Sequence, residues 1–184
     1  MGVVVDKEHV IIKKFKECAK ISNLIITTGG VSVGDADYIR DALNKIGKIN
    51  FWKIAIKPGR PLAYGKISKS FFFGLPGNPV SAAVTFELFV IPAINKILGL
   101  KQKIKLIIKA KTISEIKKKK GRVEYKRACL VQNEKGSFVK ISGLQGSNIL
   151  TSLSKANCYI RLSSNVSIVK KNSVVDVIPF SEKI

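Results

Sequence analysis

The stretch that decides the fold is Asn23-Leu24-Ile25-Ile26-Thr27, followed by Thr28-Gly29-Gly30-Val31-Ser32-Val33-Gly34-Asp35. The first run is short and apolar, which is typical of a strand buried in a parallel sheet. The second run is a glycine-rich loop, and a helical pattern follows it over about 36–46 and stops at Gly47. A strand, a glycine-rich loop and a helix in this order predict an α/β fold.

The flanking sequence continues the alternation of helices and strands. Upstream, Asp6 is expected to cap a helix whose apolar residues share one face: Val10, Ile11, Phe15, Cys18 and Ala19. Downstream we expect a strand over 49–56, a turn over 57–61, a hairpin of strands 62–67 and 70–74, and a helix over 79–98. That helix is mostly apolar, so we expect it to be buried, with a kink at Pro92.

The composition changes near Gly99, where we place a domain boundary between 1–99 and 100–184. Beyond it, Gly and Asn separate short runs of Ile, Val and Leu. These runs predict strands over 104–112, 122–132, 138–141, 158–162 and 173–178. Short strands of this kind indicate a small β-barrel or sandwich.

Composition excludes several classes of protein. Three cysteines without short spacings and a single His9 argue against a disulfide scaffold, a zinc site and a Ser-His-Asp triad. No uninterrupted apolar run approaches the ~20 residues that span a bilayer, and the N-terminus lacks the features of a signal peptide. We therefore expect a cytoplasmic protein without membrane contact.

The charge is strongly positive, with 33 basic and 12 acidic residues and a net charge of +21. Nucleic-acid binding is one interpretation. However, 28 of the basic residues are lysines, whereas nucleic-acid readers favour arginine. Abundant Lys and Ile together indicate biased codon usage, so we expect no nucleic-acid partner.

Three loops rich in Gly, Pro, Ser or Asn each follow a predicted strand, and ligands of open α/β sheets bind at the carboxyl ends of strands. In the first loop, glycines allow close backbone approach to an anion, and Asp35 and Asp37 add carboxylates. Asp35 is equally well placed as a helix N-cap. In the second loop, Lys57 and Arg60 suit an oxyanion, unless this is only a solvated turn. In the third, Asn78 is expected to cap the helix that begins at Pro79.

The order and spacing of three strings carry a resemblance to a known family: Thr28-Gly29-Gly30-Val31-Ser32-Val33-Gly34, Ile56-Lys57-Pro58-Gly59-Arg60-Pro61 and Gly74-Leu75-Pro76-Gly77-Asn78-Pro79-Val80-Ser81-Ala82. They closely resemble the molybdopterin molybdenumtransferase family, which comprises the bacterial MoeA proteins and the E domain of gephyrin. The resemblance is strongest over 22–99. Over 100–184 it is weaker, and it depends on the strand pattern, Gly146-Ser147-Asn148 and Ala156-Asn157.

The resemblance implies a partial three-layer, MogA-like molybdopterin-binding domain over 1–99 and a MoeA-type C-terminal β-barrel over 100–184. It also implies a reaction in which adenylated molybdopterin and molybdate are the substrates, AMP is released and Mg²⁺ assists. The catalytic residues implied are Asp37, which would also bind the metal, and Arg60. The cofactor-binding residues implied are Gly29, Gly30, Ser32, Gly34, Lys57, Pro58, Gly59, Pro76, Gly77, Asn78 and Ser81.

The chain resembles about half of a family member, because the family's preceding domains and the start of its α/β domain have no counterpart. We therefore expect an exposed apolar sheet edge. The family forms dimers through those parts, so we expect a homo-oligomer or a complementing N-terminal chain. The isolated chain is expected to be poorly stable and inactive alone.

Two further functions remain open. The related adenylyltransferase that charges molybdopterin shares the α/β domain, although the appended β-domain favours the molybdenum-inserting class. A non-catalytic molybdopterin-binding scaffold, as in the gephyrin relatives, is the other alternative.

Overall fold

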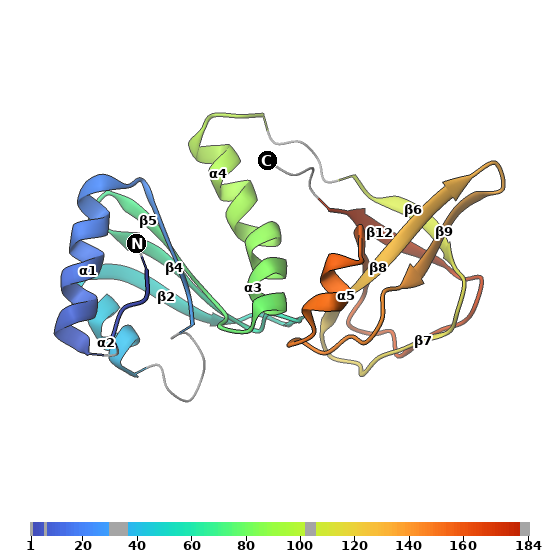
Figure 1. Ribbon diagram of the computed structural model, residues 1–184, viewed down its shortest axis with the longest axis horizontal. Coiled ribbons are helices and arrows are strands. Elements are labelled where there is room, and N and C mark those ends of the chain that lie inside the picture. Colours follow the sequence, from blue (N-terminus) through green and yellow to red (C-terminus); the bar gives the residue numbers. More distant parts are fainter. Residues whose placement is uncertain (1, 6, 30–36, 102–105, 181–184) are drawn as a thin grey trace. The chain divides into compact units, whose positions relative to one another are not determined.

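The computed structural model describes residues 2–5, 7–29, 37–101 and 106–180, and only the backbone of residues 37–40, 51 and 52 (Figure 1). The chain divides into two compact units. One contains Met1–Ile54 and Gly59–Phe86, and the other contains Ala55–Pro58 and Glu87–Ile184. The sequence predicts domains over 1–99 and 100–184. These bounds assign residues 55–58 and 87–99 to the first domain, whereas the structure groups them with the second unit. The domain bounds therefore stay a prediction.

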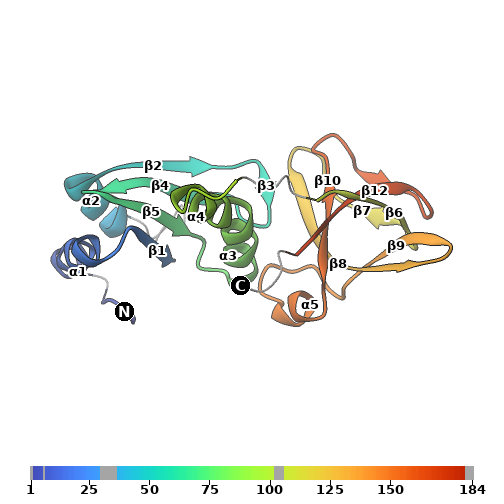
Figure 2. The same cartoon turned by 90° about the horizontal axis from the view of Figure 1, so that it is seen from above.

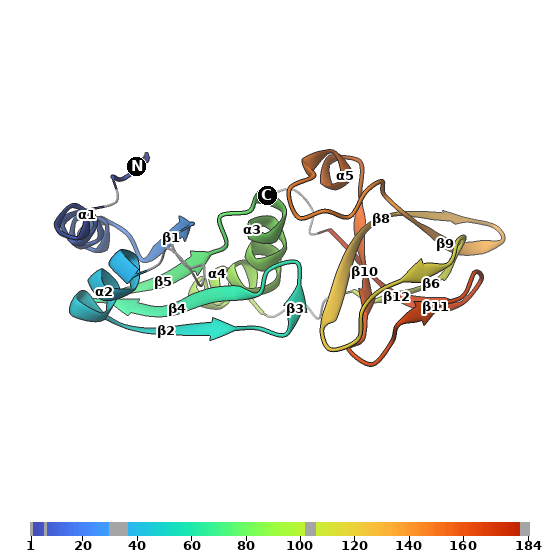
Figure 3. The same ribbon diagram turned by 90° about the horizontal axis from the view of Figure 1, so that it is seen from below.

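The first unit is a four-stranded sheet with helices, as expected for an α/β fold. The strand order is β1-β5-β4-β2, in which β1 is parallel to β5 and the other neighbours are antiparallel. Figure 3 shows these strands side by side, with β1 at one edge. The elements are α1 (Glu8–Ile21), β1 (Leu24–Thr28), α2 (Asp37–Ile46), β2 (Gly47–Lys53), β4 (Pro61–Ile67), β5 (Ser70–Leu75) and α3 (Pro79–Thr85).

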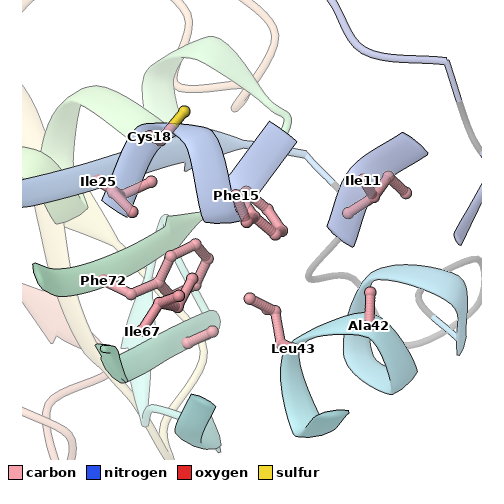
Figure 4. Close-up of a cluster of buried hydrophobic side chains, with 9 residues drawn as sticks. Ile11, Phe15, Cys18, Ile25, Ala42, Leu43, Ile67 and Phe72 are labelled. Carbon is pink, nitrogen blue, oxygen red and sulfur yellow. The ribbon is translucent and has the colours of Figure 1, made fainter. Parts of the chain in front are cut away.

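The core of this unit lies between α1, α2 and one face of the sheet. Figure 4 shows the apolar side chains of these elements pointing toward one another. The rings of Phe15 on α1 and Phe72 on β5 meet edge to face, with their centroids 5.6 Å apart. The expected apolar face of α1 is therefore real. The buried members of this core are Ile11, Phe15, Cys18, Ile25, Ala42, Leu43, Ala63, Ile67 and Phe72.

The hairpin of β4 and β5 is confirmed, but the strand expected over 49–56 is wrong. β2 ends at Lys53, and a separate strand, β3 (Ile56–Lys57), pairs with β8 (Val123–Asn133) of the second unit. The chain turns between them, where the Ile54 N–H donates to the Arg60 carbonyl at 2.7 Å. That turn ends the β2–β4 ladder, which a continuous apolar pattern does not reveal. The expected cap, Asp6, lies outside the described residues.

The long helical stretch runs from α3 through the π-helical segment η1 (Phe86–Val90) to α4 (Ile91–Ile97). The interruption expected at Pro92 is confirmed, because η1 directly precedes α4 and proline cannot donate the usual backbone hydrogen bond. The expected burial is wrong for α4, none of whose residues is buried. Apolar composition indicates that burial of a helix would be favourable. It does not show which residues would bury the helix. By length and composition alone, Pro79–Ile97 also passes as a membrane span, as the core helix of a globular protein does.

The second unit contains a closed barrel, as the sequence indicated. The strands follow the order β10-β12-β6-β9-β8, and β8 also pairs with β10, which closes the ring. Figure 2 shows this barrel from above. The sequence did not indicate the helix α5 or the β7–β11 ribbon. The remaining elements of this unit are β6 (Ile108–Thr112), β7 (Ile116–Lys117), β9 (Gly136–Ile141), α5 (Leu150–Ser154), β10 (Cys158–Leu162), β11 (Ile168–Val169) and β12 (Val174–Pro179).

Arg127 on β8 holds the loop between β9 and α5, which includes Gly146. Its guanidinium donates to the carbonyls of Leu144 and Gly146, at 3.2 and 2.9 Å, and to the Ser152 hydroxyl, at 2.9 Å. The residue is 1% exposed, and desolvation lowers the pKa of its guanidinium. A buried arginine with three such acceptors gives the loop one shape.

The first prediction concerns the core. Phe72→Ala removes a fully buried ring, so the free energy of unfolding should fall by about 3–5 kcal/mol in a urea titration. Phe71→Ala is the matched control, because the neighbouring ring is only half-buried and should cost clearly less. Equal losses from the two variants would contradict the core as described.

The second prediction concerns the loop held by Arg127. Arg127→Met leaves the carbonyls of Leu144 and Gly146 without their donor, so stability should fall by about 2–4 kcal/mol. Arg161→Met is the control, since this partly exposed arginine lies 3.7 Å from Asp176 and should matter by less than about 1 kcal/mol. Thermal and urea unfolding measure both, and an unchanged midpoint for Arg127→Met would refute the role.

Candidate functional site

The carboxyl ends of β1 and β5 lie side by side in the first unit. The parallel register pairs Thr28 with Leu75, and beyond it the Gly29 N–H donates to the Leu75 carbonyl at 3.0 Å. The loops that follow these two strands therefore leave the sheet together. The starts of the first and third loops thus lie at a carboxyl edge, where α/β folds bind ligands, and a common pocket of all three loops stays a prediction.

Two glycines bring the backbones of these loops into contact. A Cβ atom added to Gly77 would lie 3.3 Å from the Cα atom of Gly29, which is tighter than ordinary packing allows. Gly29 itself has a φ of +89°, a conformation that favours glycine. The structure thus brings together two residues expected at the site; glycine is favoured at 29 by its φ, and at 77 by the close approach of the Gly29 backbone.

Two buried oxygens beside this contact have no hydrogen-bond partner among the described residues. They are Oγ1 of Thr27, the last residue but one of β1, and Oδ1 of Asn78, the N-cap residue of α3. Asn78 takes the expected N-cap position, but its side chain makes no capping hydrogen bond, so that part of the prediction is wrong. A buried polar atom without a partner costs about 1–3 kcal/mol, which a bound ligand can recover.

Several expected site residues are not placed. Gly30, Ser32, Gly34 and Asp35 lie outside the described residues. Asp37 is the first residue of α2, and only its backbone is described. Their expected contacts with substrate and metal stay predictions.

The second loop is split between the two units, with Lys57 and Pro58 in the second and Gly59 and Arg60 in the first. Pro58 and Gly59 are buried, whereas both cations are exposed. Within the described part of the chain, the Arg60 guanidinium makes no hydrogen bond or ion pair. The Lys57 ammonium lies 3.3 Å from Oε1 of Glu124 on β8.

The remaining expected residues, Pro76 and Ser81, are buried in the first unit. The Ser81 carbonyl accepts a hydrogen bond from the Thr85 hydroxyl at 2.8 Å within α3. These residues shape the third loop and the turn that follows it. An anion contact by Ser81 stays a prediction.

Three residues of the structure that bear on the candidate site carry no functional signal in the sequence: Thr27, Glu124 and Lys126. Thr27 was included in the decisive strand, but nothing in the pattern shows that its hydroxyl lacks a partner. Glu124 and Lys126 occur in an alternating strand pattern that carries no sign of Lys57, which is remote in the chain. Only the pairing of β3 with β8 brings these side chains together.

Among the described residues, neither a metal site made of several protein ligands nor an ionised Cys158 thiol has support. Residues 2–5, 7–29, 37–101 and 106–180 contain no group of three or more His, Cys, Asp or Glu side chains placed to hold a metal ion. Burial raises the pKa of the Cys158 thiol to about 12, so this thiol is not ionised near neutral pH.

Comparisons with known proteins agree with this geometry. Residues 1–96 match the family described as "Probable molybdopterin binding domain", and residues 109–180 match "MoeA C-terminal region (domain IV)". The molybdopterin molybdenumtransferase of Haemophilus influenzae is 42% identical over 98% of this chain and 45% of its own length. The gephyrin of Dictyostelium discoideum is 33% identical over 97% of this chain and 28% of its own length.

A solved structure has the same fold. The molybdenum cofactor biosynthesis protein of Pyrococcus furiosus superposes with a TM-score of 0.74 at 25% identity, over 97% of this chain and 57% of that one. The chain spans less than half the length of the two curated relatives. The first family match covers more than half of the chain, and the fold and the paired glycine loops agree with it. The chain therefore belongs to the family of molybdopterin-binding domains, joined to a C-terminal region of the MoeA type.

Proposed function

We propose that this chain acts in molybdenum cofactor biosynthesis by binding adenylated molybdopterin at the carboxyl edge of β1 and β5. There molybdate is inserted and AMP is released. The observation that carries the proposal is a pair of buried oxygens, Thr27 Oγ1 and Asn78 Oδ1, that have no hydrogen-bond partner among the described residues. Thr27 comes two residues before Gly29 in the chain, and Asn78 directly follows Gly77. The relatives named as molybdopterin molybdenumtransferases support the reaction class.

The chemistry of the two oxygens suits the heterocycle of the substrate. An amide oxygen accepts hydrogen bonds, and a hydroxyl both donates and accepts. A pterin ring carries amino and ring N–H donors as well as acceptors. We therefore assign this edge to the pterin of the substrate.

The anionic parts of the substrates need cations. Arg60 offers a planar guanidinium without a described partner, and such a group binds phosphate or molybdate oxygens with two parallel hydrogen bonds. Lys57 offers a point charge on the same loop. We propose each residue, Arg60 in the first unit and Lys57 in the second, as a candidate ligand for molybdate or a phosphate, and the net charge of +21 attracts such anions from a distance.

Mg²⁺ belongs to the proposal only through Asp37. The described residues contain no group of three or more His, Cys, Asp or Glu side chains that could hold a metal ion, and the Asp37 side chain is not described, so Mg²⁺ enters only as an expected requirement of the reaction. The cytoplasmic location and a partner, either a second copy or a complementing N-terminal chain, are likewise proposals.

The third prediction tests the unpartnered hydroxyl. Thr27→Val replaces it with a methyl group of the same shape, so the free protein should keep its stability or gain up to about 1 kcal/mol. Affinity for molybdopterin, measured by quenching of intrinsic fluorescence, should fall roughly tenfold, because a ligand hydrogen bond is lost.

Thr112→Val is the matched control for that substitution. The Thr112 hydroxyl is also buried, but it donates to the Ser114 carbonyl at 2.7 Å in the barrel. This variant should lose about 1 kcal/mol of stability and keep its affinity for molybdopterin. If Thr27→Val loses stability and binds molybdopterin normally, the assignment of the pterin to this edge is wrong.

The fourth prediction tests the reaction and the metal together. AMP release from adenylated molybdopterin should require molybdate and should rise with added Mg²⁺. Asp37→Asn should reduce this release by at least about a hundredfold if the carboxylate holds the metal. Binding of molybdopterin without any AMP release would instead indicate a binding module, or the need for the segment that the longer relatives carry.

A further inference from the structure

Beside β3, a single carboxylate contacts two lysines within the second unit. The parallel register places Lys57 of β3 opposite Glu124 of β8, and the Val123 N–H donates to the Ala55 carbonyl at 2.9 Å. Oε1 of Glu124 lies 3.3 Å from the Lys57 ammonium and 3.1 Å from that of Lys126. One oxygen therefore faces two cations.

The three side chains differ sharply in exposure. Those of Glu124 and Lys126 are 6% and 9% exposed, whereas that of Lys57 is 51% exposed. A buried carboxylate needs a partner, and Lys126 already supplies one of opposite charge in the interior. The second partner, Lys57, is consequently not needed to neutralise Glu124, and its contact calls for another explanation.

The charges of the cluster do not cancel. Two ammonium groups and one carboxylate leave one positive charge, which lies on the exposed side at Lys57. The contact of Lys57 with Glu124 is an ion pair, and an ammonium carries three N–H donors. The Lys57 side chain is half-exposed, so this cation lies next to a buried carboxylate and still has donors available to a ligand.

We propose that Glu124 is a positioning residue that orders the Lys57 ammonium for an oxyanion substrate, while Lys126 supplies the countercharge that keeps Glu124 from neutralising Lys57. This inference rests on the proposed function, in which Lys57 binds molybdate or phosphate. A free lysine loses much side-chain freedom when it binds a ligand, and a lysine that is already ordered loses less. Glu124 therefore raises the affinity for the anion without touching it.

The test compares forms with the same net charge. In the double variant Glu124→Met/Lys126→Met, the buried pair becomes two apolar side chains of similar length, a change that folded proteins usually tolerate. The cluster keeps one positive charge, on Lys57, but loses the group that orders it. The variant Glu124→Gln/Lys126→Met keeps the same charge and restores an oxygen that accepts from Lys57.

Two measurements use the full chain. The order parameter of the Lys57 ammonium, from heteronuclear relaxation of the side-chain signals, should fall in the double Met variant and recover in part with Gln. Affinity for sodium molybdate, from titration calorimetry, should fall roughly three- to tenfold and recover in the same order, the size expected for re-ordering one long side chain. Thermal unfolding verifies that each variant is folded.

Glu115→Gln is the control, because Glu115 pairs with Lys117 at the same distance of 3.3 Å on an exposed surface. It should leave the order of Lys57 and the affinity for molybdate unchanged. An unchanged order parameter of Lys57 in the double Met variant would overturn the proposal, as would tighter binding of molybdate, which would make Glu124 a competitor of the anion.

A failure of the proposed function can be told apart from a failure of the positioning role of Glu124. If the wild-type chain and Lys57→Met take up molybdate equally, or neither does, Lys57 is not the anion ligand. The order parameter of Lys57 still decides in that case whether Glu124 positions it.

Discussion

The parallel pairing of β1 with β5 is the constraint on which the candidate site depends. It aligns the ends of two strands that are distant in the chain, so that the Gly29 N–H reaches the Leu75 carbonyl. The two loops then pass each other so closely that a Cβ atom at Gly77 would lie 3.3 Å from the Cα atom of Gly29, a tight contact that one of the loops would have to relieve by a small shift. Glycine is favoured at 77 by this approach and at 29 by its φ.

Two buried oxygens at this edge, on Thr27 and Asn78, have no partner among the described residues, and the proposed ligand site accounts for them. Folded proteins pair nearly all of their buried polar groups, so an unpaired one in a loop at a sheet edge indicates a missing partner. Elsewhere in the chain, buried hydroxyls do have partners, as Thr85 and Ser152 show. The contrast within one molecule supports a local, functional cause.

The second unit buries charged side chains in two different settings. Arg127 is surrounded by carbonyl and hydroxyl acceptors, which fix the loop around Gly146. Glu124 and Lys126 instead neutralise each other on the same strand. Because β3 adds to this barrel, Lys57 receives a buried carboxylate as its neighbour, although its loop continues into the first unit.

The sequence by itself determined the order of the elements: the apolar strand before Gly29, the hairpin of β4 and β5, the interruption at Pro92 and the barrel strands. Each depends on residues close together in the chain, through periodicity, turn chemistry or the missing N–H of proline. The same local signals could not show that β3 would leave the first sheet, that α4 would lack cover, or that Asn78 would keep an unpaired oxygen. Nor could they show that Lys57 meets Glu124. Only the tertiary structure decided these points, because strand register and the approach of distant loops arise from packing across the whole chain.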